Sequence, residues 1–281
     1  MVSDPVRLRF RALADLAVSA YMRGPTGPSS LHPLSNELGS FTASGDQTGA
    51  TSGAGLGPPS ASWPLLAGVD VWAPRGAGTV VTLGDSITDG LQSTVAQRPG
   101  ERNTRWPGHL ARRLVRGGVP LSVVNAGISG NRLLFDGFLP IFGPSALARL
   151  ERDVLAVPGV RTAVVLEGVN DIGSTPPATA REVIGALRQV VLRLRAAGIR
   201  ALVGTLTPAG STGAEEAKRL AVNRWIRGSG FADGVIEFER AIRDPDAPSR
   251  MLPRFDSGDG LHPNARGYRR MAAAVPLALL R

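Results

Sequence analysis

From residue 78 to the end of the chain, short apolar runs alternate with longer segments in which apolar residues recur every three or four positions. The short runs are rich in Val, Leu and Ala, have the length of buried strands, and lie at residues 80–83, 121–124, 160–166, 201–206 and 234–238. The longer segments have the spacing of amphipathic helices and lie at residues 106–116, 146–155, 178–197, around 220–225 and at 264–280. Alternating strands and helices favour a parallel sheet between two helical layers, with right-handed crossovers. We therefore predict an α/β fold, a flavodoxin-like three-layer α/β/α sandwich of about five parallel strands, plus N-terminal β-rich elements.

The first 75 residues have a different pattern. Apolar residues alternate with arginines over residues 6–11, and a second alternating stretch at 16–22 predicts an antiparallel hairpin. A stretch rich in Gly, Ser, Thr and Ala at 41–62 is typical of irregular structure, whereas residues 63–72 are strand-like. We therefore expect an N-terminal β-rich accessory region at residues 1–75 and a main domain at residues 76–281. His32 lies in the accessory region, where we expect a structural or exposed side chain.

Composition narrows the choice of partners and cofactors. The formal net charge is +9, but the 32 basic residues, of which Lys218 is the only lysine, are dispersed along the chain, so we expect no nucleic-acid partner. No run approaches the roughly 18 to 20 apolar residues that a membrane span needs. Cysteine is absent, the three histidines are scattered, and no glycine-rich phosphate loop follows a predicted strand, so we expect neither metal nor other cofactor. Because no secretory signal is visible, the chain is compatible with a cytoplasmic protein or a mature secreted fragment.

Candidate chemistry begins at the end of the first strand of the main domain. The run at 80–83 stops at Gly84-Asp85-Ser86, which places a serine at the carboxyl end of a buried strand. Ligands of open parallel sheets bind at this edge, beside the N-terminus of the next helix. Ser86 is therefore a candidate nucleophile. The alternative is an ordinary turn in which Asp85 or Ser86 caps a helix.

A candidate base and acid lie close together near the C-terminus, in Asp259-Gly-Leu-His262-Pro. Histidine is the side chain best suited to take a proton from a serine near neutral pH and to return it later. A carboxylate three residues earlier on a turn can bind one imidazole nitrogen and leave the other free for Ser86. The alternative interpretation is a turn aspartate beside a surface histidine.

Two further strand ends carry candidate oxyanion donors. Asn170 follows the run at 160–166, and its amide could donate to an oxyanion. Gly130 follows the run at 121–124, and a glycine lets a backbone N–H approach a substrate oxygen closely. Taken singly, each segment is also compatible with an ordinary Asn-Gly turn.

Together, the four segments resemble the four ordered sequence blocks of the SGNH (GDSL-type) hydrolases. The resemblance covers residues 78 to 281, and it departs from the family name only where Ile87 replaces leucine. It implies that residues 76–281 form an SGNH hydrolase catalytic domain. It further implies that Ser86, Asp259 and His262 form the catalytic triad and that Ser86, Gly130 and Asn170 form the oxyanion hole.

The resemblance predicts a serine esterase or acylhydrolase that cleaves short-chain carboxylic esters through an acyl-enzyme intermediate. Residues 166–173, Leu-Glu-Gly-Val-Asn-Asp-Ile-Gly, are similar to a bacterial subgroup that includes xylan-associated esterases. The expected partner is thus a small-molecule or carbohydrate ester. The alternatives are a carbohydrate O-acetyl esterase (a xylan-type deacetylase), an acyltransferase, and a non-catalytic flavodoxin-like binding module.

One apolar segment, residues 131–142, follows Gly130 directly. It is too apolar for an ordinary exposed loop. Three roles are open for this segment: it lines an acyl or aryl pocket, it lies over the site as a lid, or it packs on the N-terminal β elements.

Overall fold

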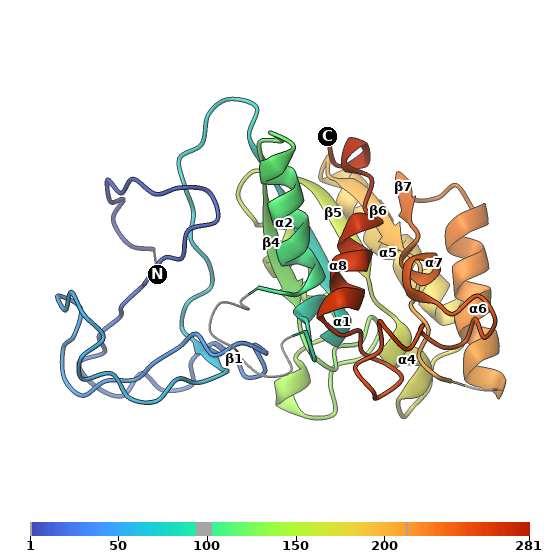
Figure 1. The fold of residues 1–281 in the computed structure, drawn as a ribbon, viewed down its shortest axis with the longest axis horizontal. Coiled ribbons are helices and arrows are strands. Elements are labelled where there is room, and N and C mark those ends of the chain that lie inside the picture. The colour runs from blue at the N-terminus through green and yellow to red at the C-terminus, as the bar shows by residue number, and fades with distance from the viewer. Residues whose placement is uncertain (1, 94–102, 212) are drawn as a thin grey trace.

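The computed structural model describes residues 2–93, 103–211 and 213–281, and its centre is a five-stranded sheet between helices (Figure 1). All five strands are parallel and run in the order β4-β3-β5-β6-β7. Their bounds are β3 (Gly78–Gly84), β4 (Leu121–Gly127), β5 (Val160–Leu166), β6 (Arg200–Gly204) and β7 (Gly234–Ile236). The predicted three-layer sandwich is therefore confirmed.

The strand order β4-β3-β5 brings three connecting segments together at the carboxyl edge of the sheet. The chain passes from β3 to its neighbour β4 and then returns across β3 to β5 on the other side. The connection after β3 runs toward one side of the sheet, and the connection after β5 runs toward the other. Ligands of open α/β sheets bind where the connections of two adjacent strands diverge in this way. The segments after β3, β4 and β5 therefore meet at this edge, and these are the segments that contain the first three sequence blocks.

Helices cover both faces of the sheet (Figure 1). Helix α2 (Trp106–Arg116) packs on α8 (Ala265–Ala273), and α5 (Ala180–Ala196) packs on both α3 (Ala146–Leu150) and α6 (Gly213–Gly228). The shorter elements are α1 (Ser86–Asp89), α4 (Val169–Gly173), α7 (Phe238–Ile242), a π-helical turn η2 (Glu151–Leu155), and the 3-10 turns η1 (Pro140–Phe142) and η3 (Leu277–Leu280). Among the described residues, no helix combines the length and apolar character needed to cross a membrane.

Two predicted helices are interrupted. The segment at 146–155 begins as α3 and continues as the π-helical turn η2. The segment predicted at 264–280 ends as α8 at Ala273 and resumes as η3 only after Pro276. Proline lacks the N–H that continues a helix and clashes with the preceding turn, which explains the second interruption.

The predicted hairpin at residues 6–22 is wrong. Residues 2–30 contain no strand, and their apolar side chains, including Val6 and Phe10, are exposed. The antiparallel pairing described in this region consists of β1 (Leu31–His32) with β2 (Trp63–Pro64) and of two isolated bridges, Ser40 with Ser60 and Ala43 with Leu56. An isolated two-stranded hairpin is marginal in water, so an alternating pattern forms strands only where another element buries the apolar face.

Buried charges lie beneath the carboxyl edge of the sheet. The side chain of Arg149 is fully buried, donates to the carbonyl oxygen of Gly84 over 3.0 Å and lies 3.6 Å from a carboxyl oxygen of Glu167. Two further buried carboxyls, Asp85 and Asp171, interact electrostatically with this pair. Burial is the largest influence on all three carboxyls and raises their pKa values, that of Asp85 to about 7. One arginine therefore lies among several carboxyls that favour the protonated state.

We predict that Gly127→Ala destabilises the protein. A Cβ at this position would lie against the backbone of the helix that begins with Ser86, including the carbonyl carbon of Thr88 at 2.8 Å. Backbone cannot rotate away as a side chain can, so we expect a loss of about 1 to 3 kcal/mol in the free energy of unfolding. Denaturant unfolding measures this loss.

Gly185→Ala is the matched control, because a Cβ there meets no atom within 4 Å and the residue lies inside α5. This variant should be stabilised by up to about 1 kcal/mol, since alanine favours a helix over glycine. Equal effects of the two substitutions would contradict the packing argument.

We also predict a specific pH dependence of stability from Asp85. Because its pKa is about 7 in the folded protein and about 4 in an unfolded chain, the folded state holds a proton between these values that the unfolded state releases. The free energy of unfolding should therefore fall as the pH rises from about 4 to about 7, by up to about 1.4 kcal/mol per pH unit, and level off above. Asp85→Asn keeps an oxygen acceptor and removes the titration, so its stability should vary less over this range.

Urea unfolding at pH 5, 6, 7 and 8 provides the comparison. Asp46→Asn is the control, because Asp46 is fully exposed and hydrogen bonds from Thr48 lower its pKa, so that it stays ionised in both states above pH 5. Equal losses of stability in Asp85→Asn and the wild type between pH 5 and 7 would show that Asp85 is not the group responsible.

Candidate active site

Ser86 lies at the carboxyl end of β3 as the first residue of α1. Asp85 has extended backbone and caps this helix, its carboxylate accepting a hydrogen bond from Ile87 N–H over 2.9 Å. The N–H of Ser86 is one of those that a helix leaves without an intrahelical partner. Gly84 is required before it, because a Cβ there would lie 2.6 Å from the carbonyl oxygen of Leu166. The sharp turn thus depends on a strand end without a side chain.

The imidazole of His262 reaches Ser86 from the far end of the chain. Its Nε2 lies 2.8 Å from Ser86 Oγ, and its Nδ1 lies 2.7 Å from a carboxylate oxygen of Asp259. The other carboxylate oxygen accepts hydrogen bonds from the backbone N–H groups of Leu261 and His262 over 2.9 and 2.8 Å. The structure therefore brings together all three residues of the predicted Ser-His-Asp constellation.

Asp259 is suited to remain an anion in this arrangement. Partial burial opposes ionisation, but the hydrogen bonds from the backbone and ring of His262 and from Leu261 N–H lower the pKa of Asp259 to about 2. With 38% of its side chain exposed, the carboxylate also keeps contact with water. An ionised Asp259 fixes the ring so that Nδ1 carries a proton toward it and Nε2 faces the serine oxygen.

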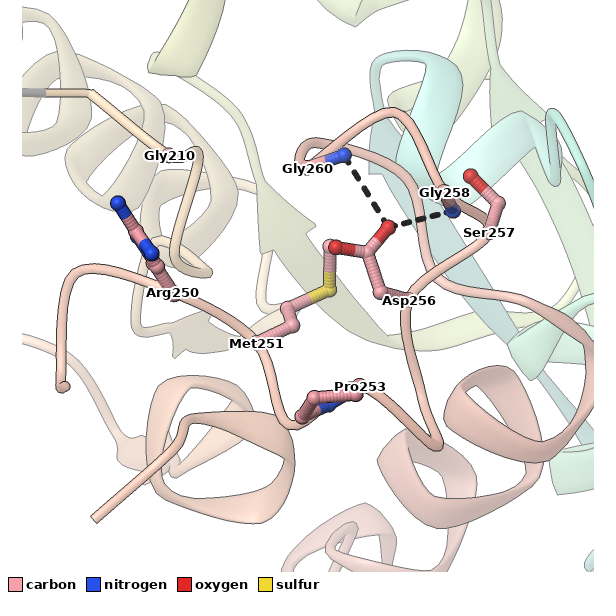
Figure 2. A pocket seen from close by; sticks show the side chains of 8 residues that line it. All are labelled: Gly210, Arg250, Met251, Pro253, Asp256, Ser257, Gly258 and Gly260. Atoms are coloured by element: carbon pink, nitrogen blue, oxygen red, sulfur yellow. Dashed lines mark hydrogen bonds between the residues drawn. The ribbon is translucent and has the colours of Figure 1, made fainter. Parts of the chain in front are cut away.

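The turn that carries Asp259 and His262 is held by its neighbours (Figure 2). Asp256 accepts hydrogen bonds from the N–H groups of Gly258 and Gly260 over 2.7 and 3.1 Å. Asn264 caps α8 and donates to the carbonyl oxygen of Asp256 over 2.8 Å. The histidine is thus oriented mainly by residues within about eight positions of it.

A pocket of about 400 Å³ adjoins this turn (Figure 2). Gly210, Arg250, Met251 and Asp256 are among the residues that line it. None of the predicted triad or oxyanion-hole residues belongs to its lining, so the pocket borders the acid-bearing turn without containing the reacting groups.

Asn170 is hydrogen bonded to the residue that follows Gly130. Gly130 has a φ of 76°, a conformation that glycine adopts readily, and its N–H takes part in no hydrogen bond among the described residues. The amide of Asn170 donates one hydrogen bond to the carbonyl oxygen of Asn131 over 2.9 Å. An amide nitrogen has two N–H donors, so the second is left for a substrate oxygen. Asn170 thus fixes the loop after Gly130 and retains a donor.

Two side chains that the sequence analysis did not identify, those of Asp171 and Asn131, also hold the loop after Gly130 in place. Asp171 accepts hydrogen bonds from the N–H groups of Leu133 and Leu134 over 2.7 and 2.9 Å. The buried amide of Asn131 donates to the carbonyl oxygens of Phe142 and Pro144 over 2.7 and 2.9 Å. The sequence offered two signals for these roles: Asp171 directly follows Asn170, and Asn131 directly follows Gly130. Their partners lie 11 to 38 positions away and could not be read from the sequence.

The apolar segment at 131–142 adjoins the predicted oxyanion hole. The ring of Phe142 lies directly against Gly130, and the ring centroid of Phe138 is 5.0 Å from that of Phe142. Leu133 is buried, whereas Phe138, Leu139 and Ile141 are exposed. The segment therefore presents apolar surface beside the site and does not form a fully buried layer.

The constellation is that of nucleophilic acyl transfer: a serine in contact with a base, an acid that orients the base, and donors close to where an oxyanion would form. The described residues contain no group of three or more His, Cys, Asp or Glu side chains placed to hold a metal ion.

The fold is similar to solved structures of esterases. A carbohydrate acetylesterase from Sinorhizobium meliloti, Est24, aligns with a TM-score of 0.57 and 19% identity over 73% of this chain and 100% of its own. The native M. smegmatis aryl esterase aligns with a TM-score of 0.55 and 17% identity over 70% of this chain and 96% of its own. At these identities the likeness concerns the fold.

No curated protein sequence matches this chain significantly. A family model does match, over residues 82–270, which include every predicted site residue. The matched family is described as the GDSL-like lipase/acylhydrolase family. Because this match spans well over half of the chain, the chain belongs to the GDSL-like lipase/acylhydrolase family, whose fold it shares with known esterases.

Proposed function

We propose that this protein is a serine esterase that cleaves short-chain carboxylic esters through an acyl-enzyme intermediate. The observation that carries the proposal is the continuous contact from Ser86 Oγ to His262 Nε2 over 2.8 Å and from His262 Nδ1 to Asp259 over 2.7 Å. A serine and a histidine in direct contact at a buried turn are the requirement for transferring the serine proton. All the proposed groups belong to residues 76–281, the proposed catalytic domain.

In the first half of the reaction, Ser86 Oγ attacks the ester carbonyl carbon and its proton passes to His262 Nε2. Asp259 stabilises the imidazolium that forms. The carbonyl oxygen becomes an oxyanion that accepts hydrogen bonds from the N–H groups of Ser86 and Gly130 and from the amide of Asn170. The C–O bond to the alcohol then breaks, and the alcohol leaves with the proton from His262.

In the second half, a water molecule attacks the acyl-serine carbonyl while His262 Nε2 takes its proton. The same donors stabilise the second tetrahedral oxyanion. The bond to Ser86 Oγ breaks, the serine recovers its proton from His262, and the acid is released. An alcohol in place of water would give acyl transfer by the same steps.

The surroundings of the site favour a short acyl group. The longest apolar segment near the proposed oxyanion hole, residues 131–142, exposes Phe138, Leu139 and Ile141 at the surface. Phe142 covers one side of Gly130. These side chains provide an apolar surface beside the site for a small acyl or aryl group. One protein with a similar fold is a carbohydrate acetylesterase, and an acetyl group falls within this size range.

We predict that Ser86→Ala lowers kcat by several orders of magnitude while the melting temperature stays close to that of the wild type. The variant loses the nucleophile, and the oxyanion donors alone supply only a small part of the rate acceleration. Hydrolysis of nitrophenyl acetate and thermal unfolding measure the two effects. Wild-type activity should also withstand EDTA.

Ser122→Ala is the control, because Ser122 is exposed on β4 and its hydroxyl bonds to residues at the opposite end of the sheet. It should keep wild-type kcat. Near wild-type activity of Ser86→Ala, or loss of wild-type activity in EDTA, would refute the metal-independent serine mechanism.

We further predict that kcat/KM is highest for acyl groups between acetyl and butyryl. Each methylene that fits a pocket contributes up to about 0.8 kcal/mol, so a deep channel would make kcat/KM rise steadily with chain length. A shallow surface reverses this trend once the chain outgrows it. The measurement is a series of nitrophenyl esters from acetyl to dodecanoyl, beside acetylated xylose oligomers.

A maximum at octanoyl or longer would contradict the short-acyl proposal and make residues 131–142 a lid of the lipase type. Higher kcat/KM for the acetylated oligomers than for any nitrophenyl ester would favour the carbohydrate O-acetyl esterase.

A further inference from the structure

A buried carboxylate that takes no part in the proposed reaction lies at the end of the nucleophile helix. Asp89 is the last residue of α1 and its side chain is almost fully buried. It accepts hydrogen bonds from the backbone N–H and the hydroxyl of Ser129 over 3.0 and 2.7 Å. Ser129 immediately precedes Gly130. The helix that begins with the proposed nucleophile is thus bonded to the residue before the proposed oxyanion-hole glycine.

Two further partners of Asp89, His32 and Asn36, come from the N-terminal region, and a third, Arg105, directly precedes α2. Asn36 donates from its amide nitrogen to Asp89 and to the hydroxyl of Ser129, over 3.0 Å in each case. His32 Nε2 lies 3.2 Å from the nearer carboxylate oxygen, and Arg105 lies 3.7 Å from it. A carboxylate is an acceptor only and has room for about four donors. Asp89 uses this capacity to join the N-terminal region to both sides of the site.

This part of the N-terminal region is fixed in its own right. The backbone N–H and the hydroxyl of Ser35 both donate to the carbonyl oxygen of Ala61, over 2.8 and 2.6 Å. The carbonyl oxygen of Ser35 accepts a hydrogen bond from Arg105 over 2.8 Å, and Arg105 also pairs with Glu37 over 3.1 Å. Asn36 itself has a φ of 57°, which asparagine tolerates better than most residues. The loop therefore presents Asn36 to the carboxylate in a defined conformation.

His32, Ser35 and Asn36 differ in burial from the first part of the N-terminal region. Residues 2–30 are exposed throughout, whereas Ser35 is buried and His32 and Asn36 are partly buried against a carboxylate of the nucleophile helix. A segment that only covered apolar surface would bury apolar side chains. These residues use hydrogen bonds instead, and a hydrogen bond fixes both distance and direction.

We propose that Asp89 is a positioning residue for the oxyanion hole and that the N-terminal segment carrying His32 and Asn36 belongs to the active site, acting through the link that Asp89 forms with Ser129. The inference rests on the proposed serine mechanism. Asp89 and Asn36 fix Ser129, and Ser129 fixes the direction of the Gly130 N–H relative to Ser86. Electrostatic stabilisation requires donors that are oriented before the charge develops, so loosening this link reduces transition-state stabilisation and leaves ground-state binding nearly unchanged.

The test compares Asn36→Ala and Asp89→Asn with the wild type on nitrophenyl acetate. Asn36→Ala should lower kcat about tenfold and change KM less than twofold, and Asp89→Asn should lower kcat further. Binding of a boronic acid that forms a tetrahedral adduct with the serine should weaken in parallel with kcat. Asn170→Ala supplies the reference, because loss of a direct oxyanion donor typically costs about a hundred to a thousandfold in kcat.

Rates are expressed per active site, titrated with a fluorophosphonate, so that loss of folded protein is not counted as loss of catalysis. Gln47→Ala is the matched control, since it removes an amide of the same region that bonds only to the nearby carbonyl oxygen of Ser44 over 3.4 Å. It should keep wild-type kcat. The double variant of Asn36 and Asp89 should lose little more than Asp89→Asn alone, because both act through one link.

A kcat per active site within twofold of the wild type for Asn36→Ala would overturn the proposal, whether or not Asp89→Asn folds. Additive losses in the double variant would overturn the claim that Asn36 and Asp89 act through one link to Ser129. Either result leaves Ser86→Ala inactive, whereas an active Ser86→Ala would refute the serine mechanism itself, so the two failures are distinguishable.

Discussion

The guanidinium of Arg149 joins the ends of the three strands around which the site is built. It donates to the carbonyl oxygens of Gly84 at the end of β3 and of Ala126 in β4, over 3.0 and 2.7 Å, and lies 3.6 Å from Glu167, which follows β5. A further hydrogen bond of 2.9 Å to the side chain of Asn131 reaches the loop after β4. Because a guanidinium is planar and carries five donors, one side chain can hold all these groups relative to one another. The relative positions of the proposed nucleophile and oxyanion donors therefore depend on it.

This arrangement also determines the electrostatics beneath the site. Asp85 and Glu167 are buried beside the guanidinium of Arg149, Asp171 interacts with Arg132, and burial raises the pKa of each of the three carboxyls. Because ionised carboxyls would oppose an oxyanion in a medium of low dielectric constant, these raised pKa values reduce the negative charge below the proposed site. The exposed Asp259 has the opposite environment, in which several N–H donors keep it ionised. The buried carboxyls beneath the sheet edge thus have raised pKa values, whereas the carboxyl proposed to orient the base has a lowered one.

The proposed catalytic residues differ in their separation along the sequence. Asp259 and His262 meet within one turn, so the orientation of the histidine depends mainly on local geometry. Ser86 and His262 are 176 positions apart and meet only because β3 and the turn before α8 lie at the same edge of the sheet. The parallel topology supplies that coincidence, since every strand of a parallel sheet ends at one edge.

The sequence by itself determined the sheet, the approximate positions of its strands, and the candidate residues Ser86, Gly130, Asn170 and His262. Strand and helix periodicities, and the glycines and asparagines of turns, are local properties that can be read along the chain. The division into an accessory region and a catalytic domain at residue 76 stays a prediction. The tertiary structure alone decided that residues 6–22 form no hairpin, because an alternating pattern cannot specify whether another element buries it. It alone also decided the surroundings of Asp89, whose donors Asn36 and Ser129 lie 53 and 40 positions away. A buried carboxylate takes its role from the donors that the fold brings to it, and those contacts exist only once the chain has packed.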